Sequence, residues 1–435
     1  MGIAIFLLPI SIHGNVNTVV GHIKEFIIAL LGHDMGKVAV PIVTFLILVT
    51  SLWAKKNHPD WITHDHVLSE AFLGGKIWLI IKSLSFILSV LVVFNLLPIL
   101  FDGTLLKYAS NIILHLIPRL LVLILVLSLT APLLLDFGLI QFTAVFTSPI
   151  MRPLFKVPGR AAVDSLASIL GSSSMAVVIS AKMHESGFYN DREAATMIAS
   201  FSLPGIYTTY ALAALLDMNY YFSQLFFVII ITSLIIALIL PRLWPLAFIP
   251  KKYVTGRERF YSSQDDPRHG HTMLEWALLR AVSKASHMNL KFYLHETISI
   301  AAPLVCCTIP LMIAVGIPLM LVAELTSIID TLALPISTLL SYAGIEDAYA
   351  IAAATVLAFF EPYVATSYAV GLASSESRFI YLAISAVSLV NIMEVGLHVW
   401  HSKIPLNFFY MLTIFIMRVT IGSFFIIPIA HYFFA

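Results

Sequence analysis

Long apolar stretches separated by short polar connections dominate the pattern of this chain. A helix needs about 20 mainly apolar residues to cross the hydrocarbon core of a bilayer. The stretches that reach or approach this length are Val38–Trp53, Ile77–Leu100, Ile112–Leu135, Ala194–Leu216, Phe222–Phe248, Ile298–Ala323, Phe379–Trp400 and Phe408–Phe434. The pattern therefore predicts an all-α polytopic membrane protein, and it leaves open whether the shorter stretch Ile3–Ile12 also spans.

Two further apolar stretches, Asp136–Glu193 and Glu324–Ser377, are interrupted by Pro, Gly and Ser residues into fragments too short to cross alone. If the flanking spans are right, each stretch must begin and end on one side of the membrane. Each is therefore expected to form a re-entrant helical hairpin. Irregular backbone at membrane depth is tolerated only where it is buried in protein or lines a cavity.

Composition and charge support this interpretation and set its direction. Hydrophobic residues make up 59% of the chain and charged residues only 11%, whereas a soluble domain carries about 25% charged residues. The segment Pro250–His295 holds the longest run of Lys and Arg, which places it in the cytoplasm by the positive-inside rule. We expect a multi-pass protein of the bacterial inner membrane. A net charge of +1 gives no indication of nucleic-acid binding.

Sliding the chain on itself by 186 residues aligns the two interrupted stretches without a gap. The strongest coincidences are Pro132 with Pro318, Pro149 with Pro335, and Arg192 with Arg378. The first stretch holds five Lys and Arg residues, whereas Thr297 to Ser377 holds none, so the two copies are expected to face opposite sides. We therefore predict two inverted-topology repeats with broken helices, divided as scaffold helices 1–110, first repeat 111–249, connecting segment 250–296 and second repeat 297–435.

Polar residues gather at the breaks of both repeats and are the candidate substrate ligands. In the first repeat the break is Gly171-Ser172-Ser173-Ser174, and in the second Glu361-Pro362 follows the equivalent position. Glu361 is the strongest candidate, because a carboxylate at a helix break within the membrane is costly and usually functional. The remaining candidate ligands are Tyr363, Asn391 and Glu394. Serine packing between helices is the alternative explanation for the first break.

The helices that follow the hairpins carry a second set of polar residues. Ser200, Ser202, Thr208 and Ser388 are candidate ligands of a coupling ion, since hard cations prefer oxygen ligands. Na⁺ or H⁺ is the expected coupling ion, and no other cofactor or metal is predicted. Interhelical hydrogen bonding is the competing explanation for each of these residues. No His-Glu-x-x-His motif or phosphate-binding glycine loop occurs, so an enzyme is not expected.

The motifs also resemble a known family. Phe6-Leu7-Leu8-Pro9-Ile10, the amphipathic segment after it, Gly171–Ser174 and Asp191-Arg192-Glu193-Ala194 are similar to those of YjiH-type bacterial membrane proteins, which contain a nucleoside-recognition or Gate domain. This resemblance implies a relationship to the concentrative nucleoside transporter fold, with paired hairpins and broken helices. The acidic residue expected in nucleoside transporters at the first hairpin is replaced by Ser172–Ser174, so the resemblance does not imply nucleoside specificity.

The leading hypothesis is secondary transport of a small polar or zwitterionic solute, such as an amino acid, dipeptide or nucleoside, by a homo-oligomer in the bilayer. The alternative is a membrane assembly or signalling subunit that has the same fold without transport. A divalent-metal transporter is a third, weaker possibility. Glu361 separates the first two: it should face a hydrated cavity in a transporter and be paired within a closed core in a scaffold.

Overall fold

The computed structural model describes residues 9–12, 15–31, 35–63, 66–96, 109–135, 137–170, 173–254, 256, 271–388, 390–396, 399–400 and 402–434. Within these ranges seven helices are long and apolar enough to cross a membrane: Lys37–Asn57, Lys76–Val93, Ile112–Leu133, Asp191–Leu215, Asn219–Arg242, Leu290–Ala323 and Phe408–Phe434. The prediction of an all-α polytopic membrane protein is confirmed. A small addition is the antiparallel pair β1 (Pro9–Ile12) and β2 (Asn15–Thr18).

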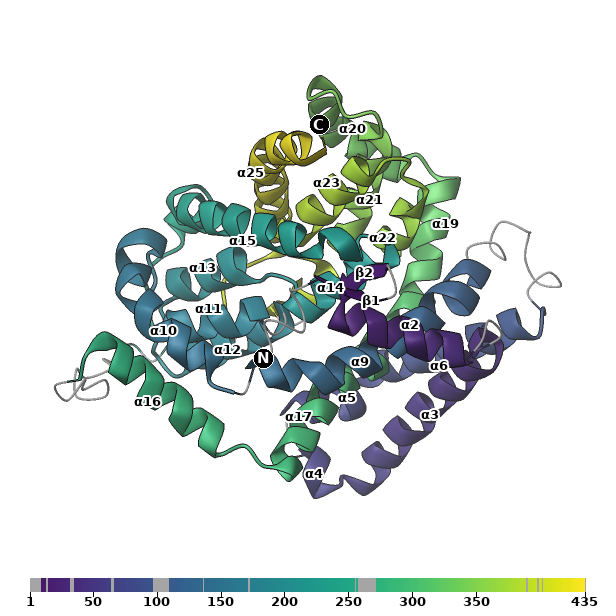
Figure 1. The fold of residues 1–435 in the computed structure, drawn as a ribbon, viewed down its shortest axis with the longest axis horizontal. Coiled ribbons are helices and arrows are strands. Elements are labelled where there is room, and N and C mark those ends of the chain that lie inside the picture. The colour runs from purple at the N-terminus through teal and green to yellow at the C-terminus, as the bar shows by residue number, and fades with distance from the viewer. Residues whose placement is uncertain are drawn as a thin grey trace.

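The N-terminal helices form one side of the molecule, where Figure 1 shows α3 and α6 beside the purple α2. Their bounds are α2 (Val19–Leu31), α3 (Met35–Asn57), α4 (Asp60–Thr63), α5 (His66–Leu73) and α6 (Lys76–Val93). Lys82 on α6 is buried and donates to Ser51 Oγ on α3 at 2.9 Å and to the carbonyl of Ala71 on α5 at 2.6 Å. Since a buried ammonium group needs such partners, Lys82 holds these three helices together.

The first interrupted stretch and its flanking spans follow. Their helices are η1 (Asn111–Leu116), α9 (Ile117–Leu135), α10 (Leu139–Ile150), η2 (Met151–Phe155), α11 (Ala161–Leu170), α12 (Ser173–Glu185), α13 (Asp191–Phe201), α14 (Ile206–Leu215), η3 (Asn219–Tyr221), α15 (Phe222–Ile239), η4 (Leu240–Arg242) and η5 (Leu246–Phe248). The stretch predicted as a hairpin is thus three short helices, α10 to α12. A broken helix, α13–α14, and a continuous span, α15, come after it.

The second interrupted stretch repeats this order. Its helices are α16 (Met273–Ser286), α17 (Leu290–Pro303), η7 (Leu304–Thr308), α18 (Ile309–Leu311), η8 (Met312–Gly316), α19 (Ile317–Leu325), α20 (Ile328–Tyr342), α21 (Ala348–Phe360), α22 (Pro362–Tyr368), η9 (Ala369–Gly371), α23 (Ser375–Val387), η10 (Ile392–Gly396) and α25 (Phe408–Phe434). After the connecting helix α16 and the long span to α19, three short helices, α20 to α22, again precede a broken helix and a continuous span.

Element boundaries in the two halves agree with the 186-residue offset. α13 ends at Phe201 and α23 ends at Val387, 186 residues later. α15 begins at Phe222 and α25 begins at Phe408, again 186 residues later. The agreement supports a structural repeat, whereas the opposite orientation of its two copies stays a prediction.

One stretch of spanning length does not form a continuous helix. Phe379–Trp400 is interrupted after Val387, where α23 ends and four residues precede η10. Polar side chains close the break locally: Ser388 Oγ donates to the carbonyl of Ser385, and Asn391 Oδ1 accepts the N–H of Val395. Side chains that bond nearby backbone compete with the helical ladder, which an apolar-length criterion does not detect.

The connecting segment contains α16, which packs against α10 at the edge of the molecule (Figure 1). Gly138, directly before α10, makes this approach possible. Its φ is +85°, and a Cβ built there would lie 2.4 Å from the carbonyl oxygen of Ala281 on α16. Only glycine accepts that conformation and that contact together.

We predict that Gly138→Ala destabilises the protein more than Gly344→Ala. Gly344 has φ +78° but nothing within 4 Å of its Cβ position, so it shares only the backbone strain of about 1–2 kcal/mol. At Gly138 the displaced α16 backbone adds about 1–3 kcal/mol. Thermal unfolding in detergent should place Gly138→Ala below Gly344→Ala by about 1–3 °C. Equal midpoints would contradict the docking of α16 on α10.

Candidate functional site

The two broken helices interrupt the molecule at equivalent places. Between α13 and α14, Ser202 to Gly205 are non-helical and buried. Pro204 contributes to this break, because proline lacks an N–H and disfavours helix at the preceding residue. Thr209 Oγ1 donates to the carbonyl of Pro204 at 3.1 Å and so satisfies one exposed acceptor. The equivalent break after Val387 is closed by Ser388 and Asn391, as described above.

A single arginine connects the two breaks. Arg418 lies on α25 and is 0% exposed. Its Nε donates to the carbonyl of Val387 at 2.5 Å, and its Nη1 donates to the carbonyl of Ala199 at 2.5 Å. Nη2 lies 3.4 Å from the carbonyl of Ser202. These carbonyls belong to the C-terminal ends of α23 and α13, where helices leave acceptors unsatisfied and carry partial negative charge.

Glu361 occupies the third break, between α21 and α22. It is 2% exposed, and its Oε2 accepts the N–H of Val364 at 2.6 Å. Glu361 is therefore the N-cap of α22, with Pro362 at the first helical position. The start of α22 packs closely against Gly316, since a Cβ built at Gly316 would lie 2.3 Å from Cγ2 of Val364. The carboxylate is inside the protein and does not face outer water.

Residues beside Glu361 attach α22 to α23. Thr366 Oγ1 and Tyr381 Oη lie 3.1 Å apart, and both residues are fully buried. Tyr363, a predicted substrate ligand, is 1% exposed within the same packed region. The second hairpin is thus fastened to the helix whose end contacts Arg418.

The predicted site residues lie on helices that contact one another across the two halves. α12, from the first hairpin, contacts η10 of the second half, and α22, from the second hairpin, contacts α14 of the first half. At the 186-residue offset these two contacts are equivalent. Each hairpin therefore packs against the segment that follows the break in the other half. Ser200, Ser202, Thr208, Ser388 and Asn391 are all buried in this region.

Several predicted residues are only partly described. Gly171 and Ser172 lie outside the described residues. Ser173, Ser174 and Glu394 are described by their backbone alone, within α12 and η10. Their predicted contacts with a solute stay predictions.

Arg418 is the residue that sequence reasoning missed. It was visible as the lone charged residue within the apolar span Phe408–Phe434. Such a residue is costly in a membrane and usually functional. Its partners are backbone carbonyls, which no side-chain motif indicates.

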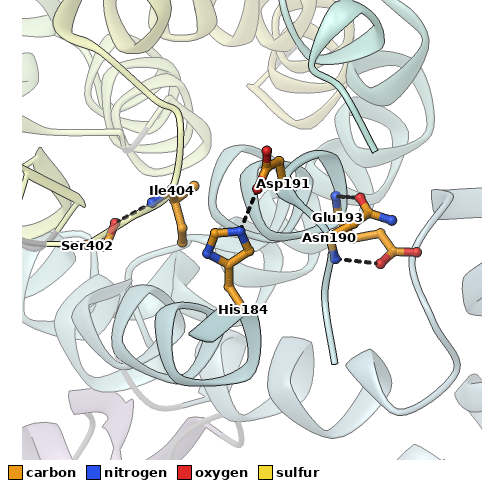
Figure 2. Close-up of polar contacts among 6 residues, drawn as sticks. All are labelled: His184, Asn190, Asp191, Glu193, Ser402 and Ile404. Carbon is orange, nitrogen blue, oxygen red and sulfur yellow. Dashed lines mark hydrogen bonds and ion pairs between the residues drawn. The ribbon is translucent and has the colours of Figure 1, made fainter. Parts of the chain in front are cut away.

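A separate polar group closes the turn between α12 and α13 (Figure 2). His184 Nε2 lies 2.7 Å from Asp191 Oδ1, with His184 fully buried and the Asp191 side chain 19% exposed. Asn190 and Glu193 form a reciprocal capping box, since each side chain accepts the other residue's N–H at 3.0 Å. This box fixes the start of α13.

The same turn is anchored to the segment after α15. The N–H of Asp191 donates to the carbonyl of Lys252 at 2.9 Å, and Arg192 Nε donates to the carbonyl of Ile249 at 2.8 Å. Arg378, the equivalent of Arg192, donates to the carbonyls of Leu372 and Leu216. The motif Asp191-Arg192-Glu193 therefore positions α13 and does not line the breaks.

An apolar cavity of about 310 Å³ lies elsewhere, between α2, α3, α9 and α17. Its lining residues include Leu121, Leu125 and Val305, and Ser128 supplies its polar side chain. Such a lining suits hydrocarbon and offers little to a polar solute. Within the described residues no group of three His, Cys, Asp or Glu side chains is placed to hold a metal ion.

Comparison with known proteins agrees with this geometry. The fold defines a multi-pass helical membrane protein, and residues 117–218 match the Gate family, described as nucleoside recognition. This match runs from α9 to the turn that follows α14, and it makes the chain a transporter-like membrane protein. An uncharacterized protein from Alkalihalophilus pseudofirmus is 30% identical over 437 residues, which cover 100% of this chain and 93% of the relative. The chain therefore belongs to the YjiH-type family of bacterial Gate-domain proteins.

We predict that Glu361→Ala lowers thermal stability more than Glu361→Gln. Alanine leaves the buried N–H of Val364 without its acceptor, which costs about 1–3 kcal/mol. Glutamine keeps an acceptor oxygen and nearly the same shape, so it can retain the cap. The control is Glu346→Gln, because Glu346 is exposed. If thermal unfolding showed the Ala and Gln variants to be equally stable, the cap would not be what Glu361 contributes.

Proposed function

We propose that this protein is a secondary transporter of a small polar or zwitterionic solute, such as an amino acid, dipeptide or nucleoside. It would act in the bacterial inner membrane, as a homo-oligomer, with Na⁺ or H⁺ as the driving ion. The observation that carries the proposal is the reciprocal packing of the two halves. The α12–η10 and α14–α22 contacts join each hairpin to the broken helix of the opposite half.

This arrangement favours transport for a physical reason. Broken helices expose backbone donors and acceptors, which are tolerated in a membrane only inside protein or beside a cavity. In secondary transporters, substrate sites lie where such breaks from two repeats meet near the midplane. Here the breaks at Ser202–Gly205 and after Val387 both lie against α25, a continuous 27-residue helix.

Glu361 is the group that we assign to the solute. A carboxylate at this depth can bind an ammonium or hydroxyl group, or carry a coupling proton. In the described conformation it caps α22 and is buried, as an occluded or resting state requires. Release of the N–H of Val364 would make the carboxylate available, so solute binding and movement of α22 would be linked. Tyr363 and the serines of α12 would complete the site.

A second candidate is a non-transporting assembly or signalling subunit. The observation that favours it is the same burial of Glu361, because a carboxylate capped within a closed core is what that alternative predicts. The two candidates differ in whether a solute stabilises the protein through Glu361.

We predict that at least one amino acid, dipeptide or nucleoside raises the thermal unfolding temperature of the detergent-purified protein. A ligand that binds the native state stabilises it by mass action. The screen includes metal ions and compares Na⁺ with choline. The shift should disappear in Glu361→Gln and persist in Glu346→Gln, which changes an exposed carboxylate without touching the site.

Three outcomes would count against the proposal. Absence of any shift across the screen would favour the assembly or signalling subunit. A shift retained in Glu361→Gln would remove Glu361 from the site. A shift with divalent metal ions alone would make metal the cargo.

A further inference from the structure

The C-terminal ends of α13 and α23 together form an arrangement typical of a cation site. Their free acceptors are the carbonyls of Ala199, Ser202 and Val387, which converge on one place. In transporters with broken helices, unwound carbonyls and half-helix C-terminal ends coordinate the coupling cation. Hard cations such as Na⁺ bind oxygen ligands of this kind.

Hydroxyl groups add to this oxygen-rich surrounding. Ser200 and Ser202 are buried beside the end of α13, and their Oγ atoms have no hydrogen-bond partner among the described residues. A buried polar atom without a partner is destabilising. Two such hydroxyls, on the residue that follows Ala199 and on Ser202 itself, are a further sign that this end of α13 accommodates a cation.

The guanidinium of Arg418 already occupies the place where these carbonyls converge. Arg418 is ten residues after the start of α25, or about 15 Å along the helix, which places it near the middle of a span. Each helix C-terminus carries about half a negative charge. Two such ends therefore balance one guanidinium charge, and within the described side chains no carboxylate contacts it.

We propose that Arg418 is a tethered cation that permanently occupies this site, so that the two broken helices are held together without a Na⁺ ion there. The inference deepens the proposed function, because it excludes this site as the place of sodium coupling. It rests on that function only for its consequence for transport. Whether cations stabilise the folded protein at the two breaks can be measured without assuming that it is a transporter.

The asymmetry of the two halves supports a single shared cation. At the 186-residue offset the equivalent of Arg418 is Thr232 on α15, which is fully buried. One half therefore supplies the charge and the other supplies a small side chain. Gly422, one turn after Arg418, allows α25 to approach α23 closely, since a Cβ there would lie 2.8 Å from Cγ2 of Val387. This approach brings Arg418 to the carbonyl of Val387.

The test is chemical rescue of Arg418→Ala, measured as thermal unfolding of the full-length protein in detergent. Removing the guanidinium leaves the carbonyls unpaired, so the midpoint should fall by about 5 °C or more. Guanidinium chloride at low, non-denaturing concentration should raise it in a concentration-dependent manner, whereas choline chloride at equal ionic strength should not. Guanidinium should give no such rise in the wild-type protein, whose own guanidinium already occupies the site.

Arg242→Ala is the matched control. Arg242 also donates to backbone carbonyls, those of Leu154 and Leu238, but it is exposed at the end of η4, which follows α15. It should lose little stability and show no rescue by guanidinium. The proposal is overturned if guanidinium fails to stabilise folded Arg418→Ala, or if it stabilises all three proteins alike.

Arg418→Lys covers the case in which the alanine variant does not fold. It keeps a tethered charge, so replacing choline by Na⁺ should shift its midpoint no more than it shifts the midpoint of the wild type. Selective stabilisation of Arg418→Lys by Na⁺ would show that tethered charge is not what fills the site. A solute screen without any hit, combined with guanidinium rescue, would refute transport while leaving the tethered cation in place.

Discussion

The structure depends on how one buried guanidinium is neutralised. A charge in the middle of a membrane span is costly unless fixed dipoles or opposite charges surround it. Arg418 meets this requirement with carbonyls from two helix C-terminal ends, one from each half of the chain. Neither helix can extend through its break without removing those acceptors. The charge of Arg418 and the breaks after Phe201 and Val387 therefore require each other, which explains why two apolar helices stop at equivalent points within the membrane.

Glu361 shows the complementary arrangement. Its carboxylate accepts the N–H of Val364 at a helix N-terminus, whereas the guanidinium of Arg418 donates to carbonyls at helix C-termini. Each charge thus lies at the helix end whose partial charge has the opposite sign. Both groups therefore contact the backbone directly at these helix ends. A charge that contacts a helix end can exchange the backbone group for a solute or water when a short helix moves.

The sequence predicted the class of fold, the interrupted stretches and the 186-residue offset, because apolar length, proline and glycine are local signals. It also indicated the helix breaks at Pro204-Gly205 and at Glu361-Pro362. It indicated a polar break within Phe379–Trp400, but it did not predict the backbone contacts by which Ser388 and Asn391 close that break. It assigned no role to Arg418, whose partners Ala199 and Val387 are 219 and 31 residues away and contribute only carbonyls. Backbone acceptors have no residue identity, so their convergence is visible only in three dimensions.

Arg418 and Thr232 occupy equivalent positions but differ in charge, and this difference limits how the two halves can move. α15 and α25 are equivalent helices of the two halves, but α25 carries a charged residue where α15 carries a hydroxyl. Since α25 supplies the guanidinium and both α13 and α23 supply acceptors, a motion that separates one of these helices from α25 leaves part of the charge unbalanced. Motion of the hairpin helices α12 and α22 carries no such penalty, because among the described residues Arg418 hydrogen-bonds to the ends of α13 and α23 and not to α12 or α22. The electrostatics therefore favour a fixed centre, formed by α13, α23 and α25, around which the two hairpins move.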